Sequence, residues 1–316
     1  METLRSYCAQ FDLEMLLASL QNLGANQITQ RTIGTLIACG LAFKLNSVLS
    51  DWALGNLSTN RPWDWNREIV LITGGSSGIG EQVALRLAER NIKVIIFDLN
   101  APKTSGHPNI FFYKVDVTSK ESVGRAAKAL REEVGEPTVL VNNAGIGHND
   151  TILSGTEESI QRTFAVNSIA HFTLAREFLP SMIEHDHGHV VTMASMASFV
   201  ALAANVDYSC SKAAAMAFHE GLRQELVVRF KVKHVRTSII HPLWVRTPMN
   251  SGMHERLGSQ MLDVGRVADR IVKQILDGKS GRVLIPSHLW VAPLVRGFPD
   301  WVQEWVRGSQ ASMVPT

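Results

Sequence analysis

The alternation of short apolar runs with longer amphipathic stretches between residues 63 and 286 constrains the fold of this chain most strongly. Most of the short runs are continuously apolar, as in "IVLIT" and "VIIF", which is typical of strands covered on both faces. Stretches long enough for helices separate these runs. Strand–helix alternation predicts an α/β fold, with one doubly wound parallel sheet of about seven strands and right-handed crossovers.

Composition divides the chain into three parts. Residues 1–62 are expected to form an apolar helical extension, residues 63–286 the sheet domain, and residues 287–316 a tail rich in tryptophan. The expected strands are Ile69–Thr73, Lys93–Asp98, Ile110–Val115, Thr138–Asn142, His189–Ala194, Val235–His241 and Arg282–Pro286. The expected helices are Gly80–Arg90, Ser119–Val134, Ile160–Ile183 and Ser209–Phe230.

Charge and cysteine content argue against several classes of protein. The 316 residues carry a formal net charge of +2 without a long basic run, so nothing favours a nucleic-acid partner. Cys8, Cys39 and Cys210 are too few and too scattered for a disulfide framework or a zinc site. We expect them to be reduced thiols in a protein that faces the cytosol. The N-terminus lacks the basic, apolar and small-residue order of a secretory signal.

The stretch "TGGSSGIG", residues 73–80, directly follows the first expected strand and opens a helix. Its glycines allow a tight turn and a close approach of the backbone to a ligand. The free N–H groups and the positive end of the helix dipole there can bind a pyrophosphate. A glycine-rich turn alone is weak evidence, because glycines also serve ordinary turns. The expected contacts of a dinucleotide in this turn are Gly74, Ser76, Ser77, Gly78, Ile79 and Gly80.

An acidic residue strengthens this interpretation and indicates which dinucleotide binds. Asp98 ends the second expected strand, 18 residues beyond Gly80, which is close to the spacing of a carboxylate that binds the adenosine ribose. A carboxylate accepts hydrogen bonds from the 2′-hydroxyl and repels a 2′-phosphate. No lysine or arginine stands in the turn or directly after Asp98. The residues therefore favour NAD over NADP.

The stretch "YSCSK" places Tyr208 and Lys212 four residues apart, on one face of an expected helix. A nearby ammonium lowers the pKa of a phenol, which suits a general acid or base near neutral pH. An isolated YxxxK is more often a pair of surface residues. Here polar stretches also follow three other expected strands: "VNNAG", "VVTMASMAS" with Ser195, and "HPLWVRTP".

In order and approximate spacing, the glycine-rich turn, "NNAG", Ser195 and YxxxK resemble the motifs of the classical short-chain dehydrogenases/reductases, over roughly residues 66–286. The resemblance implies a Rossmann-like domain that transfers hydride between NAD(P) and an alcohol or carbonyl. It makes Tyr208 the acid/base, and Lys212 the group that lowers its pKa and holds the nicotinamide ribose. Ser195 would bind the substrate oxygen, and Asn167 would hold a proton-relay water. The remaining implied cofactor contacts are Asp116, Val117, Asn143, Ala144, Gly145, Pro242, Val245 and Thr247.

Some residues depart from this pattern or compete with it. The family often has Pro-Gly after the sixth strand, whereas Leu243 follows Pro242 here, so the shape of that loop stays open. Ser198 and Ser211 are rivals of Ser195, which is favoured by its spacing and its position at a strand end. The "HDHGH" stretch is interpreted as a solvated turn rather than a set of metal ligands, and we expect no metal.

The N-terminal extension has the features of a membrane segment. Thr32–Ser50 is 19 residues with one charge, Lys44, close to the length needed to cross a bilayer. Trp52, Trp63 and Trp65 follow it, as in an interfacial aromatic belt. Upstream, leucines repeat at helical spacing (Leu13, Leu16, Leu17 and Leu20). The alternative is a pair of helices that pack on protein.

These features predict an oxidoreductase that acts on an alcohol or carbonyl of a lipophilic substrate, such as a retinoid, a steroid or a long-chain lipid. The chain looks like the membrane-associated retinol and 17β-hydroxysteroid dehydrogenase branch, often found at the endoplasmic reticulum or lipid droplets. That resemblance implies the same location here, with the catalytic domain facing the cytosol. The alternatives are a reductase that tailors a polyketide or terpenoid, and a catalytically silent nucleotide-binding scaffold.

Two further expectations concern assembly and the tail. Many members of the resembled family pair through the helices that carry the Asn167 and Tyr208 segments, and small residues such as Ala170 and Ala217 lie there, so we expect a homodimer. In the tail, Trp301 and Trp305 share a helical face near Phe298. The tail is interpreted as a lid, a membrane contact or a simple packing helix.

Overall fold

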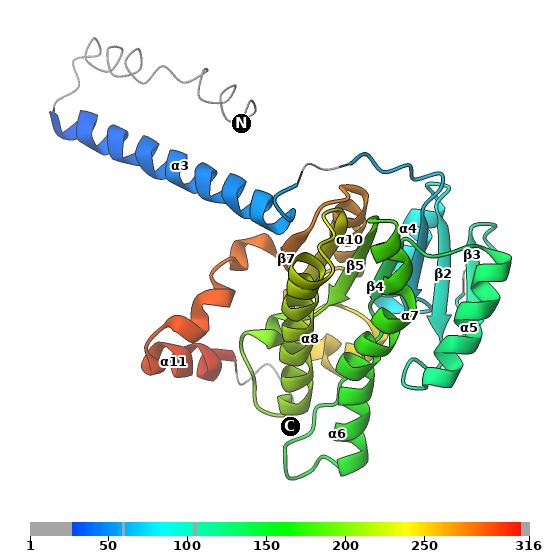
Figure 1. Ribbon diagram of the computed structural model, residues 1–316. Helices are drawn as coiled ribbons and strands as arrows, with labels where there is room; N and C mark the ends of the chain where they lie inside the picture. Colours follow the sequence, from blue (N-terminus) through cyan, green and yellow to red (C-terminus); the bar gives the residue numbers. More distant parts are fainter. Residues whose placement is uncertain (1–26, 59–60, 104–105, 311–316) are drawn as a thin grey trace. The chain divides into compact units, whose positions relative to one another are not determined.

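The computed structural model describes residues 27–58, 61–103 and 106–310 (Figure 1). The chain divides into two compact units, Met1–Ala53 and Leu54–Thr316. The division lies closer to the N-terminus than the expected boundary at residue 62, and the tail belongs to the same unit as the sheet. Cys8 and the leucine repeat of residues 13–20 lie outside the described residues.

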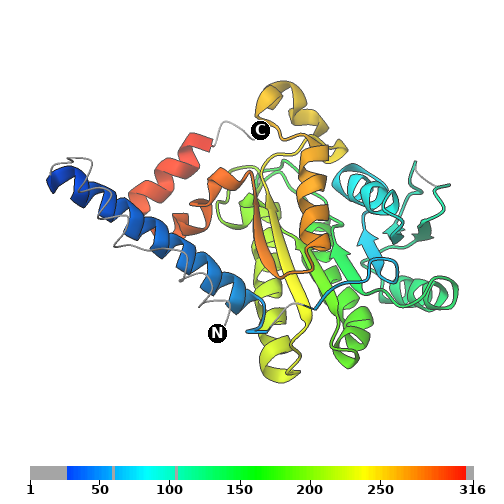
Figure 2. The ribbon, with the colours of Figure 1, turned by 90° about the horizontal axis from the view of Figure 1, so that it is seen from above.

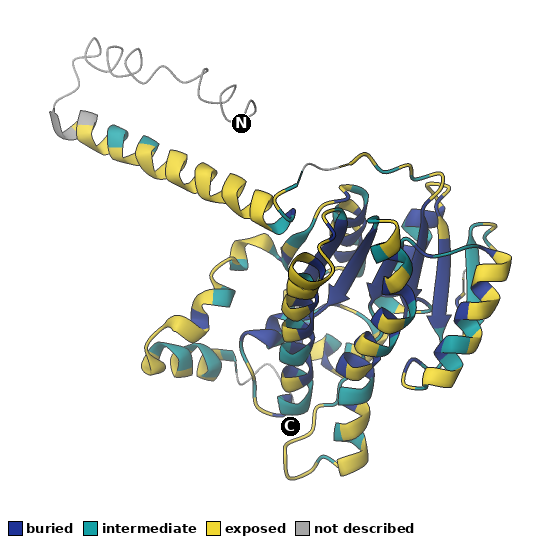
Figure 3. Ribbon diagram, in the orientation of Figure 1, coloured by how far each residue is buried: buried dark blue, intermediate teal, exposed yellow. Residues whose placement is uncertain are grey.

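The N-terminal unit contains one long described helix, α3 (Gln27–Leu54). Its 28 residues include a candidate membrane span, Arg31–Leu54, which at 24 residues is long enough to cross a bilayer. Nearly all of its described side chains are exposed, including Phe43 and Trp52 (Figure 3). The predicted N-terminal apolar helix is therefore confirmed.

The second unit is built on a seven-stranded sheet of order β3-β2-β1-β4-β5-β6-β7, in which every pair is parallel (Figures 1 and 2). The predicted doubly wound α/β fold is confirmed, and each predicted strand is present to within about one residue at either end. The strands are β1 (Ile69–Thr73), β2 (Lys93–Asp98), β3 (Ile110–Lys114), β4 (Val139–Asn142), β5 (Gly188–Met193), β6 (Val235–Pro242) and β7 (Gly281–Ile285).

Helices cover both faces of the sheet because alternate side chains of each strand point to opposite faces. On one face, Ile95, Phe97 and Leu140 pack against helices α5 (Lys120–Glu133), α7 (Ala170–Glu184) and α8 (Val206–Gln224). On the other face, Val70 and Ile96 pack against helices α4 (Gly78–Ala88) and α10 (Val264–Leu276). The carboxyl ends of the strands therefore meet at one edge, where ligands of such sheets bind.

The expected helix Ile160–Ile183 is not regular along its length. It consists of α6 (Glu157–Phe164), a π-helical turn η1 (Ala165–Ile169) and α7. The π turn carries Asn167, which is fully buried. Single π turns inside α-helices are rare and are frequently found at functional sites, and residue pattern alone did not indicate this one.

The segment that follows α3 is bound to the amino end of the sheet. The guanidinium of Arg236, on β6, is buried and donates through Nη1 to the carbonyl of Gly55 at 2.7 Å. The Asn56 side chain donates to the carbonyl of Val235 at 3.2 Å, and Ser58 Oγ donates to that of Lys233 at 2.9 Å. These contacts explain why the sheet unit begins near residue 54.

Candidate active site

The glycine-rich turn joins the end of β1 to the start of α4 and needs glycine for steric reasons. Gly74 has a φ of +64°, and a Cβ there would come within 2.8 Å of Ala144 Cα. A Cβ on Gly80 would collide with the carbonyl oxygen of Gly74 and with the Asn143 amide. The turn and the strand end at "NNAG" are therefore in direct contact, which leaves the backbone open toward a ligand.

Asn143 fastens the turn to the end of β4. Its Nδ2 donates to the carbonyl oxygens of Thr73 at 2.9 Å and Gly74 at 3.0 Å. The Thr73 hydroxyl in turn accepts from the backbone N–H groups of Asn143 and Ala144, each at 3.0 Å. This reciprocal set of hydrogen bonds holds the two strand ends in a fixed relation.

Asp98 lies at the carboxyl end of β2, next to the turn. Its Oδ2 accepts the backbone N–H of Ser76 at 3.0 Å, and its Oδ1 accepts that of Asn100 at 3.1 Å. The carboxylate is half-buried, so its position is fixed while part of it stays accessible. It stands where a ribose hydroxyl of a dinucleotide on the turn would come.

Asp116 and Val117 follow β3. Asp116 Oδ1 accepts from the backbone N–H of Thr118 at 2.9 Å and from its hydroxyl at 2.6 Å. The Thr118 hydroxyl is the main cause that lowers the pKa of Asp116, with Arg162 adding a smaller effect from 4.0 Å. Val117 is buried beneath this turn.

A cavity of about 160 Å³ opens at the carboxyl edge, between the turn and the ends of β4, β5 and β6. The predicted site residues that line it are Gly74, Ser77, Gly78, Ile79, Asn143, Ala144, Gly145, Ser195, Tyr208, Lys212, Pro242, Val245 and Thr247. Ser76, Gly80, Asp98, Asp116, Val117 and Asn167 lie outside its walls. Leu243 and Asn250 also line the cavity, although sequence reasoning did not assign them a contact.

Lys212 is buried in α8, and its ammonium donates to the carbonyl of Met193 at 2.9 Å. Burial lowers the pKa of Lys212 to about 8, because the charged form is poorly solvated there. The Nζ atom lies 5.6 Å from the centroid of the Tyr208 ring. The ammonium is thus near the phenol, on the floor of the cavity.

The pKa of Tyr208 differs from the sequence-based expectation. We expected Lys212 to lower it, but in this structure the pKa of Tyr208 is raised, because burial disfavours the phenolate. A hydrogen bond with the Ser195 side chain acts in the opposite direction and favours the phenolate. Desolvation outweighs the neighbouring groups, an effect that spacing along a helix cannot reveal.

Ser195 is the serine that reaches the cavity. It precedes the short helix η2 (Met196–Ser198), and its hydroxyl accepts the N–H of Ala197 at 3.2 Å. The rival Ser198 is fully buried and donates to the carbonyl of Lys212 at 3.0 Å. Ser211 is also buried, and it donates to the carbonyl of Tyr208 at 2.7 Å. Both rivals therefore bind backbone instead of facing a ligand.

His241, near the end of β6, supports Ser195, and sequence reasoning missed it. Its Nδ1 lies 3.0 Å from the Ser195 carbonyl oxygen, so Nδ1 carries the proton and donates. The imidazole is fully buried and lies 4.4 Å from the Phe199 ring. Burial lowers the pKa of His241 to about 4, so the ring is neutral at physiological pH. Its position one residue before Pro242 was the available signal.

Asn167 fixes the loop that leaves β4. Its Oδ1 accepts the N–H of Ile146 at 2.8 Å, and its Nδ2 donates to the Ile146 carbonyl at 2.8 Å. The same Nδ2 donates to Ser211 Oγ at 3.0 Å. The π turn therefore joins α8, which carries the tyrosine and lysine, to the loop beside Gly145.

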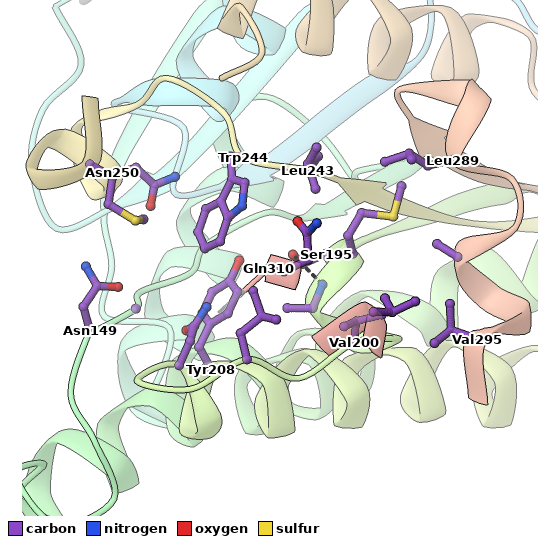
Figure 4. A pocket seen from close by; sticks show the side chains of 18 of the residues that line it. Asn149, Ser195, Val200, Tyr208, Leu243, Trp244, Asn250, Leu289, Val295 and Gln310 are labelled. Atoms are coloured by element: carbon purple, nitrogen blue, oxygen red, sulfur yellow. Dashed lines mark hydrogen bonds between the residues drawn. The ribbon is translucent and has the colours of Figure 1, made fainter. Parts of the chain in front are cut away.

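A second, larger cavity of about 340 Å³ adjoins the first and shares Ser195, Tyr208, Leu243, Met249 and Asn250 with it (Figure 4). Its walls are mostly apolar and come from far apart in the sequence. They include Met196, Ala197, Val200, Leu202, Trp244, Met253, Leu289, Val291, Ala292, Val295 and Val306. Besides the shared Ser195, Tyr208 and Asn250, its polar lining comprises His148, Asn149, Asn205 and Gln310. No lysine, arginine, aspartate or glutamate lines it among the described residues.

The histidines of the "HDHGH" stretch have separate partners. His185 Nδ1 bonds the carbonyl of Ser181 at 2.8 Å, and His187 Nε2 bonds the Glu68 carboxylate at 3.1 Å. His189 is buried in β5 and bonds Ser238 Oγ at 2.9 Å. The stretch leads into β5 and makes structural contacts, and His189 lies within the strand, as expected.

The sequence is similar to known proteins. The sequence model of the family described as short chain dehydrogenase matches residues 68–258. Dehydrogenase RED2 of Cochliobolus heterostrophus is 44% identical over 208 residues, which cover 65% of this chain and 78% of that protein. The 17-beta-hydroxysteroid dehydrogenase 13 of Homo sapiens is 34% identical over 230 residues, covering 70% of this chain and 76% of that protein.

Solved structures share the fold. A short chain dehydrogenase/reductase from Burkholderia phymatum, in complex with NAD, superposes with a TM-score of 0.65 at 21% identity. The alignment covers 74% of this chain and 95% of that one. A short-chain dehydrogenase from Streptomyces avermitilis gives a TM-score of 0.63 at 24% identity, covering 78% and 98% of the two chains.

Proposed function

Since the chain belongs to the short-chain dehydrogenase family of oxidoreductases, we propose that it is a membrane-associated, NAD-dependent enzyme that interconverts an alcohol and a carbonyl of a lipophilic substrate. One observation carries the proposal. Ser195 and Tyr208 line both the cavity beside the glycine-rich turn and the apolar cavity next to it. A hydroxyl and a phenol at that junction can meet a substrate oxygen on one side and a cofactor on the other.

The residues at the carboxyl edge fit a nicotinamide dinucleotide. Glycines at 74 and 80 leave room that a Cβ would fill, and the following helix α4 offers its amino end to a pyrophosphate. Asp98 would bind the adenosine ribose and disfavour a 2′-phosphate, which supports NAD over NADP. Asp116 and Val117 would adjoin the adenine, and Lys212 the nicotinamide ribose. The bound nicotinamide would supply the hydride donor or acceptor of the reaction.

The protein residues would handle the proton. In the reductive direction, the Tyr208 hydroxyl donates its proton to the substrate oxygen while the Ser195 hydroxyl donates a hydrogen bond to the same oxygen. The ammonium of Lys212 stabilises the phenolate that remains, since with a pKa of about 8 it is mostly protonated at neutral pH. Asn167 would hold the loop and helix that define a proton path to solvent. Oxidation follows the same steps in reverse.

The lining of the larger cavity supports a lipophilic substrate. Its apolar walls enclose about 340 Å³, within the size range of small-molecule pockets, and burial of apolar area there would drive binding. A retinoid, a steroid or a long-chain lipid fits this chemistry. The test is a turnover screen of these three classes, with NAD for the alcohols and NADH for the carbonyl compounds. Polyketide and terpenoid ketones are included with NADH, because the catalytic residues would be identical.

The possible outcomes of the screen distinguish the proposed function from its alternatives. We expect turnover with at least one lipophilic class, and turnover at least about a hundredfold lower in the Tyr208→Phe variant. If no class turns over while NAD binds, the chain is a catalytically silent nucleotide-binding scaffold. Preference for polyketide or terpenoid ketones would replace the proposed substrate class and leave the reaction type intact.

Helix α3 supports a membrane-bound location. Its candidate span is long enough for a bilayer, and the proposed site is the endoplasmic reticulum or lipid-droplet surface, with the catalytic unit facing the cytosol. In cell fractions, the full chain should sediment with membranes and resist extraction by high salt, because apolar burial rather than charge holds it. Removal of residues 1–53, which keeps the contact of the buried Arg236 with Gly55, should release much of the protein. A full-length chain found wholly in the soluble fraction would contradict this location.

We also propose a homodimer, and exposed apolar residues on η1 and α7 support it. Ile169, at the end of η1, and Phe172, on α7, are exposed. Ala170, Ala175 and Ala215 are buried within the subunit and cannot form an interface. Light scattering of the detergent-extracted protein should give a dimer mass at micromolar concentration. A monomer mass would contradict it.

A further inference from the structure

The C-terminal segment, residues 287–310, has an inner side that builds the substrate cavity. It consists of the short helices η6 (Ser287–Leu289) and η7 (Ala292–Gly297), followed by α11 (Asp300–Gln310). Six of its residues line the larger cavity: Leu289, Val291, Ala292, Val295, Val306 and Gln310. Figure 4 shows Leu289, Val295 and Gln310 around the cavity that Ser195 and Tyr208 share.

The outer side of the same segment is apolar and exposed. We call Trp290, Leu294, Phe298, Trp301 and Trp305 the tryptophan face; all five are exposed, Trp301 at 74% and Trp305 at 69%. On α11, the partly buried residues are Val302, Gln303, Val306, Arg307 and Gln310, and none is fully buried (Figure 3). The two tryptophans, at i and i+4, therefore lie together on the opposite side of the helix.

A specific contact holds this segment against the active site. The Arg296 guanidinium donates to the carbonyl of Phe199 at 3.1 Å through Nε and to that of Ser198 at 3.0 Å through Nη2. Both carbonyls belong to η2 and its end, and Ser195 is the residue that precedes η2. The segment is thus a fixed wall of the site, and its outer side has a defined orientation relative to the cavity.

We propose that the tryptophan face docks on a lipid surface and that substrate enters the larger cavity directly from that surface. The proposal rests on the proposed function for its substrate class. Indole rings favour the boundary between lipid and water, because one part of the ring is apolar and the N–H needs a polar partner. A lipophilic substrate partitions into lipid, so an entrance between a lipid-bound wall and the cavity avoids passage through water.

Charge distribution agrees with a lipid surface and with neutral lipid in particular. Asp300 and Glu304 on the helix are offset by Arg296 and Arg307, and Arg307 is already paired with Glu304 at 2.5 Å. Within residues 287–310, no cluster of basic groups points to anionic headgroups. Burial of the aromatic side chains would therefore provide the attraction, so the contact should depend little on salt or on anionic lipid.

The test uses the full chain in vesicles of phosphatidylcholine whose acyl chains carry bromine, a short-range quencher of indole fluorescence. The emission of Trp301 and Trp305 is obtained as the difference between wild type and the Trp301→Phe/Trp305→Phe variant. Both residues are exposed, so the substitutions leave no internal cavity, and circular dichroism verifies the fold. The matched control is Trp63→Phe/Trp65→Phe, a stacked pair with ring centroids 5.3 Å apart. Both rings are partly buried against the core of the sheet unit instead of forming the expected interfacial belt.

We expect brominated vesicles to remove most of the difference emission of Trp301 and Trp305 and to spare that of Trp63 and Trp65. The loss should be the same in high salt and with anionic lipid added. Unquenched Trp301 and Trp305 in vesicle-bound protein, equal loss from both pairs, or failure of the full chain to bind vesicles would each overturn the proposal. A dimer that dissociates in the Trp301/Trp305 variant, without quenching, would assign the face to a second copy.

Because this measurement needs no turnover, it is separable from the substrate screen. If the quenching is seen and no lipophilic substrate turns over, the lipid contact stands and the proposed substrate class fails. If turnover is seen and the quenching is not, the enzyme is confirmed and the route of entry through the tryptophan face is wrong.

Discussion

The two cavities at the carboxyl edge of the sheet differ in how they are built. The smaller one is lined by short motifs at the ends of the neighbouring strands β1, β4, β5 and β6, together with Tyr208 and Lys212 on α8. Hydrogen bonds among backbone groups, Thr73 and Asn143 fix its shape. The larger one is lined by apolar side chains from five or more separate loops and helices, including the C-terminal segment. Ser195 and Tyr208 stand between them.

The difference separates reaction type from substrate choice. A cofactor that is the same in many enzymes can be bound by backbone geometry, which requires glycine, asparagine and aspartate at fixed points. A substrate is recognised by the shape and polarity of side chains on loops, and loops tolerate change. Substitutions in the small cavity should therefore alter cofactor binding, and substitutions in the large cavity should alter substrate preference. Substitutions where the two cavities meet should alter the rate of the chemical step.

The largest effect is expected at the junction. Tyr208→Phe removes the proton that the substrate oxygen needs and should lower turnover by at least about a hundredfold, the range typical of a positioned acid or base. NAD binding, measured by fluorescence titration, should be nearly unchanged. Turnover close to that of wild type would remove Tyr208 from the mechanism.

A smaller effect is expected from the cofactor side alone. Asp98→Ala should weaken NAD binding by about ten- to a hundredfold, because hydrogen bonds to a charged group contribute about 1.5–3 kcal/mol. Binding of NADP should change little or improve, so the gap between the two cofactors narrows. Calorimetric titration of both dinucleotides measures this. Tighter binding of NADPH than NADH by the unmodified protein would refute the role of Asp98.

On the substrate side, Ala292→Phe adds a ring to the wall of the larger cavity. It should raise KM for long-chain substrates several-fold and leave the dissociation constant of NAD unchanged, because the ring occupies volume that only the substrate uses. The control is Leu153→Phe, on a fully exposed position outside both cavities. Equal effects of the two substitutions on KM would contradict the assignment of this cavity.

The smallest effect is expected behind the junction. His241→Leu removes the donor to the Ser195 carbonyl. It should lower kcat by about fivefold, because one hydrogen bond contributes about 1 kcal/mol and that energy corresponds to about fivefold in rate. His241→Asn keeps a donor and should recover much of the rate. Because the pKa of His241 is about 4, its ring gains a proton only below that pH, and neither variant should alter the pH profile of turnover above about pH 6. If the pH profile of wild-type turnover has a limb near the pKa of a histidine, and this limb disappears in His241→Asn, then His241 titrates in the working pH range.

Much of the sheet and of the small cavity could be predicted, because the pattern of apolar residues indicates the strands and short sequence motifs indicate the cavity residues. The seven strands follow from continuous apolar runs, and thirteen predicted site residues line one cavity. The raised pKa of Tyr208 could not be predicted, since desolvation depends on everything that packs around the ring. His241, Arg296 and the π turn at Asn167 were missed for a similar reason. Their roles arise from contacts with residues far away in the sequence.

The central claim is that catalysis occurs where the two cavities meet, and it is tested most directly by the dependence of kcat/KM on the chain length of the substrate. Secondary alcohols of increasing length are oxidised with NAD by the wild-type protein, and kcat/KM is measured for each. We predict that kcat/KM rises by up to about fourfold per methylene, from about 0.8 kcal/mol of apolar burial, until the larger cavity is filled, and that Tyr208→Phe lowers turnover by at least about a hundredfold at every length. A kcat/KM that does not depend on chain length, or turnover close to that of wild type in Tyr208→Phe, would contradict it.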